Sequence, residues 1–204
     1  FMSYSITDKV SDIYGEVLEY NNFGMKIKIV YENKEYTFNS KLVGNYNLSN
    51  ILSCVGVLVK LGREMNDIIE KIQKIESVPG RFQLIENDKA IRVVVDFAHT
   101  EDGLINVLQT LKEMTKNKVI TIFGAGGDRD KAKRKKMGIA ATKYSDYIII
   151  TSDNPRNENP IDIINEIESG LQEVPFPKEK YETKADREQA IERDIELSRE
   201  NDSV

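Results

Sequence analysis

Val119-Ile120-Thr121-Ile122-Phe123, followed directly by Gly124-Ala125-Gly126-Gly127-Asp128-Arg129-Asp130, joins a short apolar run to a glycine-rich polar turn. An apolar run of this length bounded by turn residues predicts a buried strand. A second run, Tyr147 to Thr151, leads in the same way into Asp153-Asn154-Pro155-Arg156. Because parallel strands present their carboxyl ends at one edge of a sheet, we expect both polar segments to line one binding site.

Strands and helices alternate on both sides of these runs. Ile91 to Val95 predicts a strand, and an apolar face at helical spacing between Leu104 and Met114 predicts the helix that leads to Val119. Another helix is expected at about Lys131 to Lys143. This order predicts an α/β fold with a Rossmann-like, mostly parallel sheet and helices on both of its faces.

The alternation continues toward the end of the chain. Pro160 opens a further helix, whose inward-facing residues are expected to be Ile161, Ile164 and Ile167. From Tyr181 the pattern is strand-like and then helical, and Ser203-Val204 resembles the start of another strand. We therefore expect a sheet that is truncated at its end.

The first part of the chain has a different pattern. Short β-branched and aromatic runs predict an antiparallel meander of strands at Glu16 to Tyr20, Met25 to Tyr31 and Glu35 to Asn39, with turns at Asn21-Asn22 and Glu32-Asn33. The meander is expected to precede two helices.

The first of these helices has apolar residues at helical spacing from Leu48 to Val59, and Leu61-Gly62 gives a stop signal. The second is shorter, at about Met65 to Ile75. Val78-Pro79-Gly80 breaks both periodicities, because proline and glycine disfavour helix and strand interiors. We expect a domain boundary there.

The composition limits the class of protein. The 204 residues carry a formal net charge of -5, which argues against a general nucleic-acid binder, because such affinity depends largely on Lys and Arg. No apolar run is long enough to cross a bilayer and no leader opens the chain, so a cytoplasmic location without a membrane partner is expected. The single cysteine, Cys54, lies in an apolar run and is interpreted as a small core residue.

A third polar segment, Asp96-Phe97-Ala98-His99-Thr100, follows the Ile91 to Val95 strand. His99 is the only histidine, so no histidine-based metal site is expected, and a plain hydrogen-bonding role is the alternative to a functional one. Gly126-Gly127 offers amides to an anion, or is simply a tight connection to the next helix. The basic residues that begin that helix, read alone, mostly form a solvated face: Lys131, Lys133, Arg134, Lys135 and Lys136.

Two further residues have a functional and a structural interpretation. Arg156 follows a proline that fixes the backbone, and its guanidinium offers a two-point contact to a carboxylate; the alternative is an exposed turn arginine. Asn47 stands near a predicted helix start, where asparagine usually caps the helix. The alternative is an amide that recognises the planar edge of a ligand.

Five segments, in this order, resemble the Mur ligase family: GNYNLSN at 44–50, GRF at 80–82, DFAHT at 96–100, FGAGGDRDKAKR at 123–134 and DNPR at 153–156. The likeness runs from about Lys41 to Gly170 and is greatest to the UDP-N-acetylmuramoyl-tripeptide synthetase branch, which adds the third residue of the peptidoglycan stem. It implies an ATP-dependent ligase that acts on UDP-N-acetylmuramoyl-L-Ala-D-Glu through an acyl phosphate. Arginine at the end of DNPR implies meso-diaminopimelate as the amino acid, since L-lysine lacks the second carboxylate.

The resemblance also implies roles for single residues. Those that would lie against the adenine are Asn47 and Asn50. Those that would line the ribose and phosphates are Arg81, Asp96, His99 and Lys131. Of these, the expected catalytic residues are Arg81, His99 and Lys131. Those that would hold the amino acid are Arg129, Asp153, Asn154 and Arg156. ATP and Mg²⁺ are the implied cofactors, with no metal ligand assigned in this chain.

Residues 1–78 resemble the end of the family's central, ATP-binding domain, and residues 79–204 most of its C-terminal, amino-acid-binding domain. The sequence contains no G-x-x-x-x-G-K-[ST] loop, which would cradle the phosphates. We therefore expect a fragment that is inactive alone. The family's UDP-binding domain and its modified lysine would precede Phe1, and a GKGHE-like segment that completes the amino-acid pocket would follow Val204.

Two other functions are considered. A sibling ligase such as folylpolyglutamate synthase shares the architecture, but the GDRD and DNPR segments favour the peptidoglycan branch. A non-catalytic, Rossmann-like binding or regulatory module is favoured by the missing phosphate loop.

Overall fold

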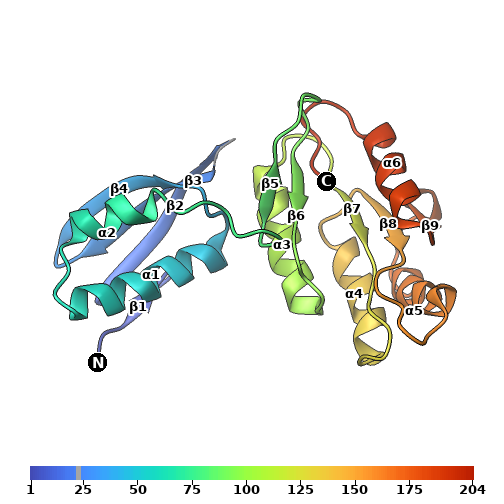
Figure 1. The fold of residues 1–204 in the computed structure, drawn as a ribbon, viewed down its shortest axis with the longest axis horizontal. Coiled ribbons are helices and arrows are strands. Elements are labelled where there is room, and N and C mark those ends of the chain that lie inside the picture. Colours follow the sequence, from blue (N-terminus) through green and yellow to red (C-terminus); the bar gives the residue numbers. More distant parts are fainter. Residues whose placement is uncertain (22–23) are drawn as a thin grey trace. The chain divides into compact units, whose positions relative to one another are not determined.

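The computed structural model describes residues 1–21 and 24–204. The chain forms two compact units, Phe1–Phe82 and Gln83–Val204, each with its own strands and helices (Figure 1).

The first unit is built on a four-stranded sheet of order β1-β2-β3-β4. Its strands are β1 (Tyr4–Ser5), β2 (Ile13–Asn21), β3 (Gly24–Tyr31) and β4 (Lys34–Ser40). β2, β3 and β4 pair antiparallel, which confirms the predicted meander. β1 pairs parallel to β2 and is too short to leave a pattern in the sequence.

The predicted turn at Glu32-Asn33 is confirmed. Both residues have positive φ, 50° and 60°, as a two-residue type I′ hairpin turn requires. The other predicted turn, Asn21-Asn22, includes Asn22, which lies outside the described residues.

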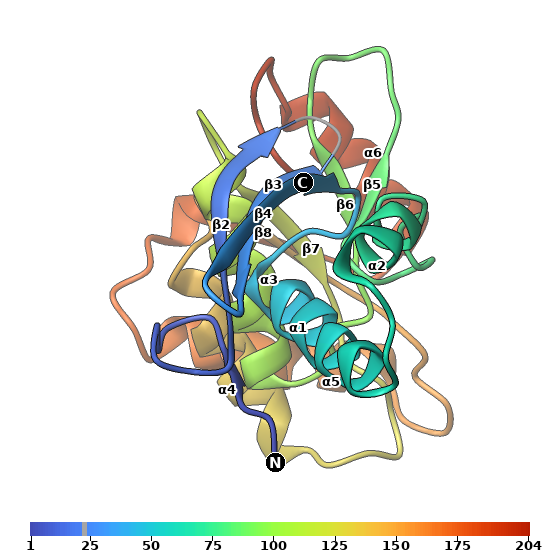
Figure 2. The same ribbon diagram turned by 90° about the vertical axis from the view of Figure 1, so that its left-hand side faces the viewer.

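Two helices, α1 (Asn45–Lys60) and α2 (Met65–Ile72), cover this sheet (Figure 2). They confirm the predicted pair, although α2 ends before the predicted Ile75. The residues of one shared core come from both helices and from alternate positions of β3: Met25, Ile27, Ile29, Leu48, Ile51, Leu52, Val55, Met65, Ile68 and Ile72. Burial of such a stripe on a sheet is the main source of stability for helices of this length.

The prediction that Cys54 is a core residue is wrong, because Cys54 is exposed. The buried stripe of α1 runs through Ile51, Leu52 and Val55, and position 54 lies beside it. An apolar sequence neighbourhood therefore did not place the side chain on the buried face.

The second unit contains a parallel sheet of order β7-β8-β9 and an antiparallel pair, β5-β6. The bounds are β5 (Gln83–Ile85), β6 (Val93–Val95), β7 (Ile120–Phe123), β8 (Tyr147–Thr151) and β9 (Tyr181–Lys184). The parallel sheet and its flanking helices confirm the predicted α/β class. β5 was not predicted from the sequence, because it has only three residues.

The last residues of the chain lie between β6 and β7. Ser203 forms parallel bridges with Arg92 and with Val119. Val204 accepts a hydrogen bond from the Val94 amide and donates one to the Arg92 carbonyl oxygen, both at 2.8 Å. The predicted strand-helix-strand unit is therefore interrupted, because β6 and β7 pair with this segment rather than with each other.

The helices of this unit are α3 (Glu101–Met114), α4 (Ala132–Thr142), α5 (Pro160–Gln172) and α6 (Arg187–Leu197), with a short 3₁₀ helix, η1 (Lys178–Lys180). Figure 1 shows them flanking the strands. Ile161, which was predicted to face inward, is 47% exposed, because the buried stripe of α5 begins at Ile163. No helix among the described residues is both long and apolar enough to cross a membrane.

Two glycines allow α4 and α5 to touch. A Cβ atom added to Gly138 would lie 2.3 Å from the Ile167 carbonyl oxygen, and one added to Gly170 would lie 2.1 Å from the Lys135 carbonyl oxygen. Both distances are shorter than any tolerated contact. The close packing of these helices fixes the loops that precede them.

A buried carboxyl group lies where α6 approaches the last residues of the chain. Asp194 is 1% exposed, and its Oδ1 has no hydrogen-bond partner among the described residues. Burial, and then the neighbouring Asp202, raise the pKa of Asp194 to about 7. Asp202 accepts hydrogen bonds from the amides of Lys118 and Arg199.

We expect the free energy of unfolding to fall as the pH rises from 3.8 to about 7, because Asp194 ionises near 3.8 in the unfolded chain and only near 7 in the folded one. Asp194→Asn removes this titration and should raise stability at alkaline pH by on the order of 2 to 4 kcal/mol. Urea denaturation of the chain across this pH range measures both effects. Asp88→Asn, at an exposed position, is the control, and equal pH profiles for the two variants would contradict the expectation.

Candidate functional site

Three polar segments of the second unit follow strands that run in one direction. They are residues 96–100 after β6, 124–130 after β7 and 153–158 after β8. β7 and β8 pair in parallel, and Ser203 runs parallel to both β6 and β7. All three segments therefore leave the same edge, where α/β sheets bind their ligands.

The 124–130 turn and the 153–158 loop, together called the rim below, are joined backbone to backbone. The Gly127 amide donates a hydrogen bond to the Asn154 carbonyl oxygen at 2.8 Å. A Cβ atom on Gly127 would lie 1.8 Å from the Pro155 carbonyl oxygen, and one on Gly124 would lie 2.3 Å from the Thr151 carbonyl oxygen. Glycine is required at both positions, because no side chain fits.

Two amides of the turn, those of Gly127 and Asp128, donate hydrogen bonds within the protein. Besides the Gly127 amide, the Asp128 amide donates to Glu158 Oε1 at 2.6 Å, and the Ala132 amide donates to Asp130 Oδ1 at 2.9 Å. Of the two interpretations of Gly126-Gly127, the geometry favours the tight connection over an anion cradle.

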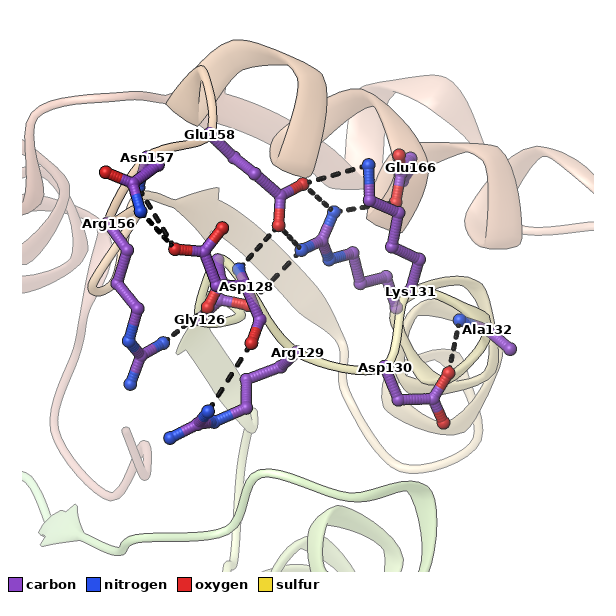
Figure 3. A network of polar contacts seen from close by, with 12 residues as sticks. Gly126, Asp128, Arg129, Asp130, Lys131, Ala132, Arg156, Asn157, Glu158 and Glu166 are labelled. Carbon is purple, nitrogen blue, oxygen red and sulfur yellow. Dashed lines mark hydrogen bonds and ion pairs between the residues drawn. The ribbon is translucent and has the colours of Figure 1, made fainter.

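Arg129 and Arg156 both donate hydrogen bonds to main-chain oxygens of this turn. Arg156 Nη1 donates to the Gly127 carbonyl oxygen at 2.5 Å, and Arg129 Nη1 donates to the Asp128 carbonyl oxygen at 3.4 Å. In Figure 3 both side chains point away from Glu158. Within the described part of the chain, neither guanidinium is paired with a carboxylate. Exposed arginines in this state are suited to bind a carboxylate ligand.

Asp153 and Asn154 lie on the same rim and are exposed. Their main-chain oxygens hold the loop, since Asn154 accepts from the Gly127 amide and Asp153 accepts from Ser152 Oγ at 3.0 Å. The structure thus brings together the four residues that were expected to hold the amino acid. Their role stays a prediction.

A buried arginine lies beneath the rim. The Arg134 side chain is 0% exposed and binds both carboxylate oxygens of Glu158, at 2.8 and 2.9 Å, and Glu166 Oε2 at 2.9 Å. The prediction of a solvated basic face is therefore wrong for Arg134. It shares a buried stripe with Met137, Gly138 and Ala141, and this helical spacing is the signal that could have identified it.

Glu158 accepts hydrogen bonds from both Arg134 and the Asp128 amide (Figure 3). Its Oε2 also lies 3.1 Å from Lys131 Nζ. Arg134, and then the Asp128 amide, lower the pKa of Glu158 to about 2, and Glu158 in turn raises the pKa of Arg134. Glu158 and Glu166 were not predicted from the sequence, because Glu158 precedes α5 and Glu166 lies within it, and glutamates at such positions are common and carry no distinguishing spacing.

Side-chain oxygens of the 96–100 segment accept hydrogen bonds from nearby backbone amides. Asp96 Oδ1 accepts from the Ala98 amide at 2.7 Å, and Thr100 caps α3 by accepting from the Gly103 amide at 3.1 Å. His99 Nδ1 donates to the Phe97 carbonyl oxygen at 3.0 Å, since a carbonyl oxygen only accepts. This bond fixes the imidazole and leaves Nε2 of the exposed ring for a ligand.

Asn47, Asn50 and Arg81 belong to the first unit. Asn47 is buried, and its Nδ2 donates to the Val43 carbonyl oxygen at 2.8 Å. The capping interpretation of Asn47 is wrong, because the N-cap residue of α1 is Gly44 and no side chain caps this end of the helix. Asn50 and Arg81 are exposed. The nucleotide roles expected of these three residues stay predictions.

Comparison with known proteins identifies the family to which this sequence belongs. Residues 80–204 match the glutamate ligase domain of the Mur ligases, and residues 1–58 match the Mur ligase middle domain. The chain belongs to the Mur ligase family. Its GDRD and DNPR segments thus form the rim of a Mur ligase.

Two curated relatives of this Mur ligase chain bear the name UDP-N-acetylmuramoyl-L-alanyl-D-glutamate--2,6-diaminopimelate ligase. The one from Aquifex aeolicus is 42% identical over 181 residues, which cover 89% of this chain and 36% of the relative. The one from Syntrophomonas wolfei is 40% identical over 202 residues, which cover 99% of this chain and 41% of the relative. The chain spans about two fifths of the length of these relatives.

A solved structure of a ligase with the same name has a similar fold. It superposes with a TM-score of 0.69 at 33% sequence identity and covers 100% of this chain and 41% of that one.

Proposed function

We propose that this chain is part of an ATP-dependent ligase that adds meso-diaminopimelate to UDP-N-acetylmuramoyl-L-Ala-D-Glu in peptidoglycan synthesis. The observation that carries the proposal is the pair Arg129 and Arg156 on one rim, each hydrogen-bonded to a carbonyl oxygen and, across residues 1–21 and 24–204, neither paired with a carboxylate. Diaminopimelate carries a second carboxylate that these guanidinium groups can bind. The names of the relatives support the same substrate.

In this proposal the rim binds and orients the amino acid. Arg129 and Arg156 bind the distal carboxylate, while Asp153 and Asn154 hold the ammonium-bearing part. The substrate carboxylate takes the ATP γ-phosphate to form an acyl phosphate, with release of ADP. An amine of the bound amino acid then attacks its carbonyl carbon, and the amide bond forms as inorganic phosphate leaves and the amine loses a proton. Holding the two reactants in place accounts for much of the rate of such a transfer.

Residues outside the rim are proposed to contact the nucleotide: Asn47, Asn50, Arg81, Asp96, His99 and Lys131. ATP supplies the phosphoryl group, and cations near its phosphates stabilise the charge that develops in transfer. The exposed His99 Nε2 and Lys131 Nζ fit this role, since the Lys131 side chain is 63% exposed and its ion pair with Glu158 can open.

Magnesium is the second cofactor of the proposed reaction. Across residues 1–21 and 24–204, no group of three or more His, Cys, Asp and Glu side chains is placed to hold a metal ion. These residues alone do not fit a magnesium site, and we assign none of them as a ligand.

The two parts of the chain receive separate assignments in this proposal. Residues 1–78 form the end of the ATP-binding domain, and residues 79–204 form the amino-acid-binding domain, which the family matches support. A reaction that uses ATP and a nucleotide-linked sugar places the enzyme in the cytoplasm.

The reaction itself tests the proposal. A Mur ligase that contains this chain is incubated with UDP-MurNAc-dipeptide, meso-diaminopimelate, ATP and Mg²⁺, and the tripeptide product is identified by mass spectrometry. The 204-residue chain alone should show no turnover, because its sequence has no phosphate-cradling G-x-x-x-x-G-K-[ST] loop. No product from the longer protein would favour a non-catalytic module, and rapid turnover by the chain alone would contradict its assignment as a fragment.

Arg81→Ala and His99→Ala, made in the ligase, should each lower the ligation rate by about ten- to a hundredfold, because a hydrogen bond to a charged group contributes roughly 1.5 to 3 kcal/mol. Diaminopimelate binding should be nearly unchanged in both variants. Steady-state kinetics with each substrate varied in turn measure the effect. Arg63→Ala, another exposed arginine of the first unit, is the control, and wild-type kinetics in both test variants would make Arg81 and His99 structural residues.

A further inference from the structure

One carboxylate, that of Glu158 at the end of the 153–158 loop, joins this loop to the 124–130 turn from the side opposite to the exposed arginines of the rim (Figure 3). Glu158 Oε1 accepts from the Asp128 amide at 2.6 Å and from Arg134 Nη2 at 2.8 Å. Oε2 accepts from Arg134 Nη1 at 2.9 Å and pairs with Lys131 Nζ at 3.1 Å. All four contacts go to residues 128–134, which belong to the turn or to the helix it opens. Three of them are made by the buried Arg134 or by a main-chain amide, and the fourth by the exposed Lys131.

The contact between the two segments is reciprocal. Glu158 binds the Asp128 amide, and Asp128 Oδ2 in return accepts from Asn157 Nδ2 at 2.7 Å. Asp128 and Arg156 both have positive φ, 53° and 51°. A residue other than glycine keeps such a conformation when its surroundings fix it. The Glu158 and Asp128 carboxylates, each of which accepts a hydrogen bond from the other segment, supply that constraint.

The loop also holds Arg156 directly. The Glu158 amide donates to the Pro155 carbonyl oxygen at 3.0 Å, which closes a turn with Arg156 inside it. Arg156 then donates to the Gly127 carbonyl oxygen, and Arg129 donates to the carbonyl oxygen of the next residue, Asp128. The separation of the two guanidinium groups therefore depends on how the loop sits against the turn.

We propose that Glu158 is a positioning residue of the amino-acid pocket, which fixes the separation of Arg129 and Arg156 without touching the substrate. The inference rests on the function proposed above. Arg134 anchors Glu158 from α4, and Glu166 anchors Arg134 from α5. Two-point capture of a carboxylate by separate arginines fails when their spacing changes, because a misplacement of about 1 Å can cost as much as 10²-fold in rate.

Glu158→Gln tests the inference, since it keeps the size of the side chain and removes the charge that Arg134 and the Asp128 amide share. In the complete ligase the KM for diaminopimelate should rise by about ten- to a hundredfold, with the KM for UDP-MurNAc-dipeptide within about twofold of wild type. Glu166→Gln leaves the Glu158 contacts in place and should have a smaller effect. Glu173→Gln removes a surface ion pair between α4 and α5, with Lys135, and should match the wild type.

A second variant separates positioning from stability. In Arg134→Leu with Glu158→Leu, two apolar side chains replace a buried ion pair, an exchange that often preserves the fold. The unfolding temperature of this double variant should be close to that of the wild type, while its KM for diaminopimelate stays raised. A normal KM in Glu158→Gln, or a KM that recovers together with stability in the double variant, overturns the inference. A wild-type enzyme that does not use diaminopimelate overturns the proposed function instead.

Discussion

Arg156→Ala should reduce the preference of the ligase for meso-diaminopimelate over L-lysine, which we expect to be about 10⁴-fold in the wild type, mainly by weakening the use of diaminopimelate. The Arg156 guanidinium lies on the rim and donates a hydrogen bond to the Gly127 carbonyl oxygen, with no carboxylate partner among the residues that the structure describes. A pocket that holds two arginines for a distal carboxylate rejects lysine, because lysine lacks that carboxylate and leaves both guanidinium charges uncompensated. Ligation with each amino acid in parallel, with kcat/KM for both, measures the change.

Arg156→Lys should not restore the preference, since an ammonium cannot reproduce the planar two-point contact. Arg187→Ala is the matched control, because Arg187 is an exposed arginine that donates to the Ser152 carbonyl oxygen at 3.3 Å, next to the same loop. If Arg156→Ala keeps the wild-type selectivity, this loop is not the specificity element.

Gly127→Ala should separate the two segments of the rim and lower kcat/KM for diaminopimelate by about 10²-fold or more. The added Cβ would lie 1.8 Å from the Pro155 carbonyl oxygen. That oxygen belongs to the backbone and cannot rotate away, so the turn and the loop must move apart. This movement would also break the hydrogen bond from the Gly127 amide to the Asn154 carbonyl oxygen.

Gly56→Ala is the control for this substitution. A Cβ on Gly56 meets only side-chain atoms at 3.5 Å or more, and alanine in a helix interior is more stable than glycine by about 1 kcal/mol. Gly56→Ala should therefore keep full activity. Equal kcat/KM values for Gly127→Ala and the wild type would show that the rim does not need its close backbone contact.

Periodicity and turn residues were enough to predict most elements of the fold. Tyr147 to Thr151 was predicted as a strand with the bounds that β8 has, and Pro160 opens α5. These segments are long, or are flanked by strong breakers, so local sequence determines them. The three segments at one sheet edge followed from the parallel order of the strands.

Other features depend on partners far away in sequence and left no local pattern. Ser203 pairs with Arg92 and Val119, and no property of Ser203 itself indicates where it inserts. Arg134 looked like one of several solvated cations, yet it is buried because Glu158 and Glu166 neutralise it. The residues that touch the substrate in our proposal could be named from a resemblance, whereas the groups that hold them required the structure.

The most direct test of the account is competition between meso-diaminopimelate and L-lysine for the wild-type ligase that contains this chain. Both amino acids are supplied together at equal concentration with UDP-MurNAc-dipeptide, ATP and Mg²⁺, and the two tripeptide products are quantified by mass spectrometry. Since Arg129 and Arg156 carry no carboxylate partner on the described rim, the diaminopimelate product should exceed the lysine product by about 10⁴-fold. Equal amounts of the two products, or an excess of the lysine product, would contradict the account.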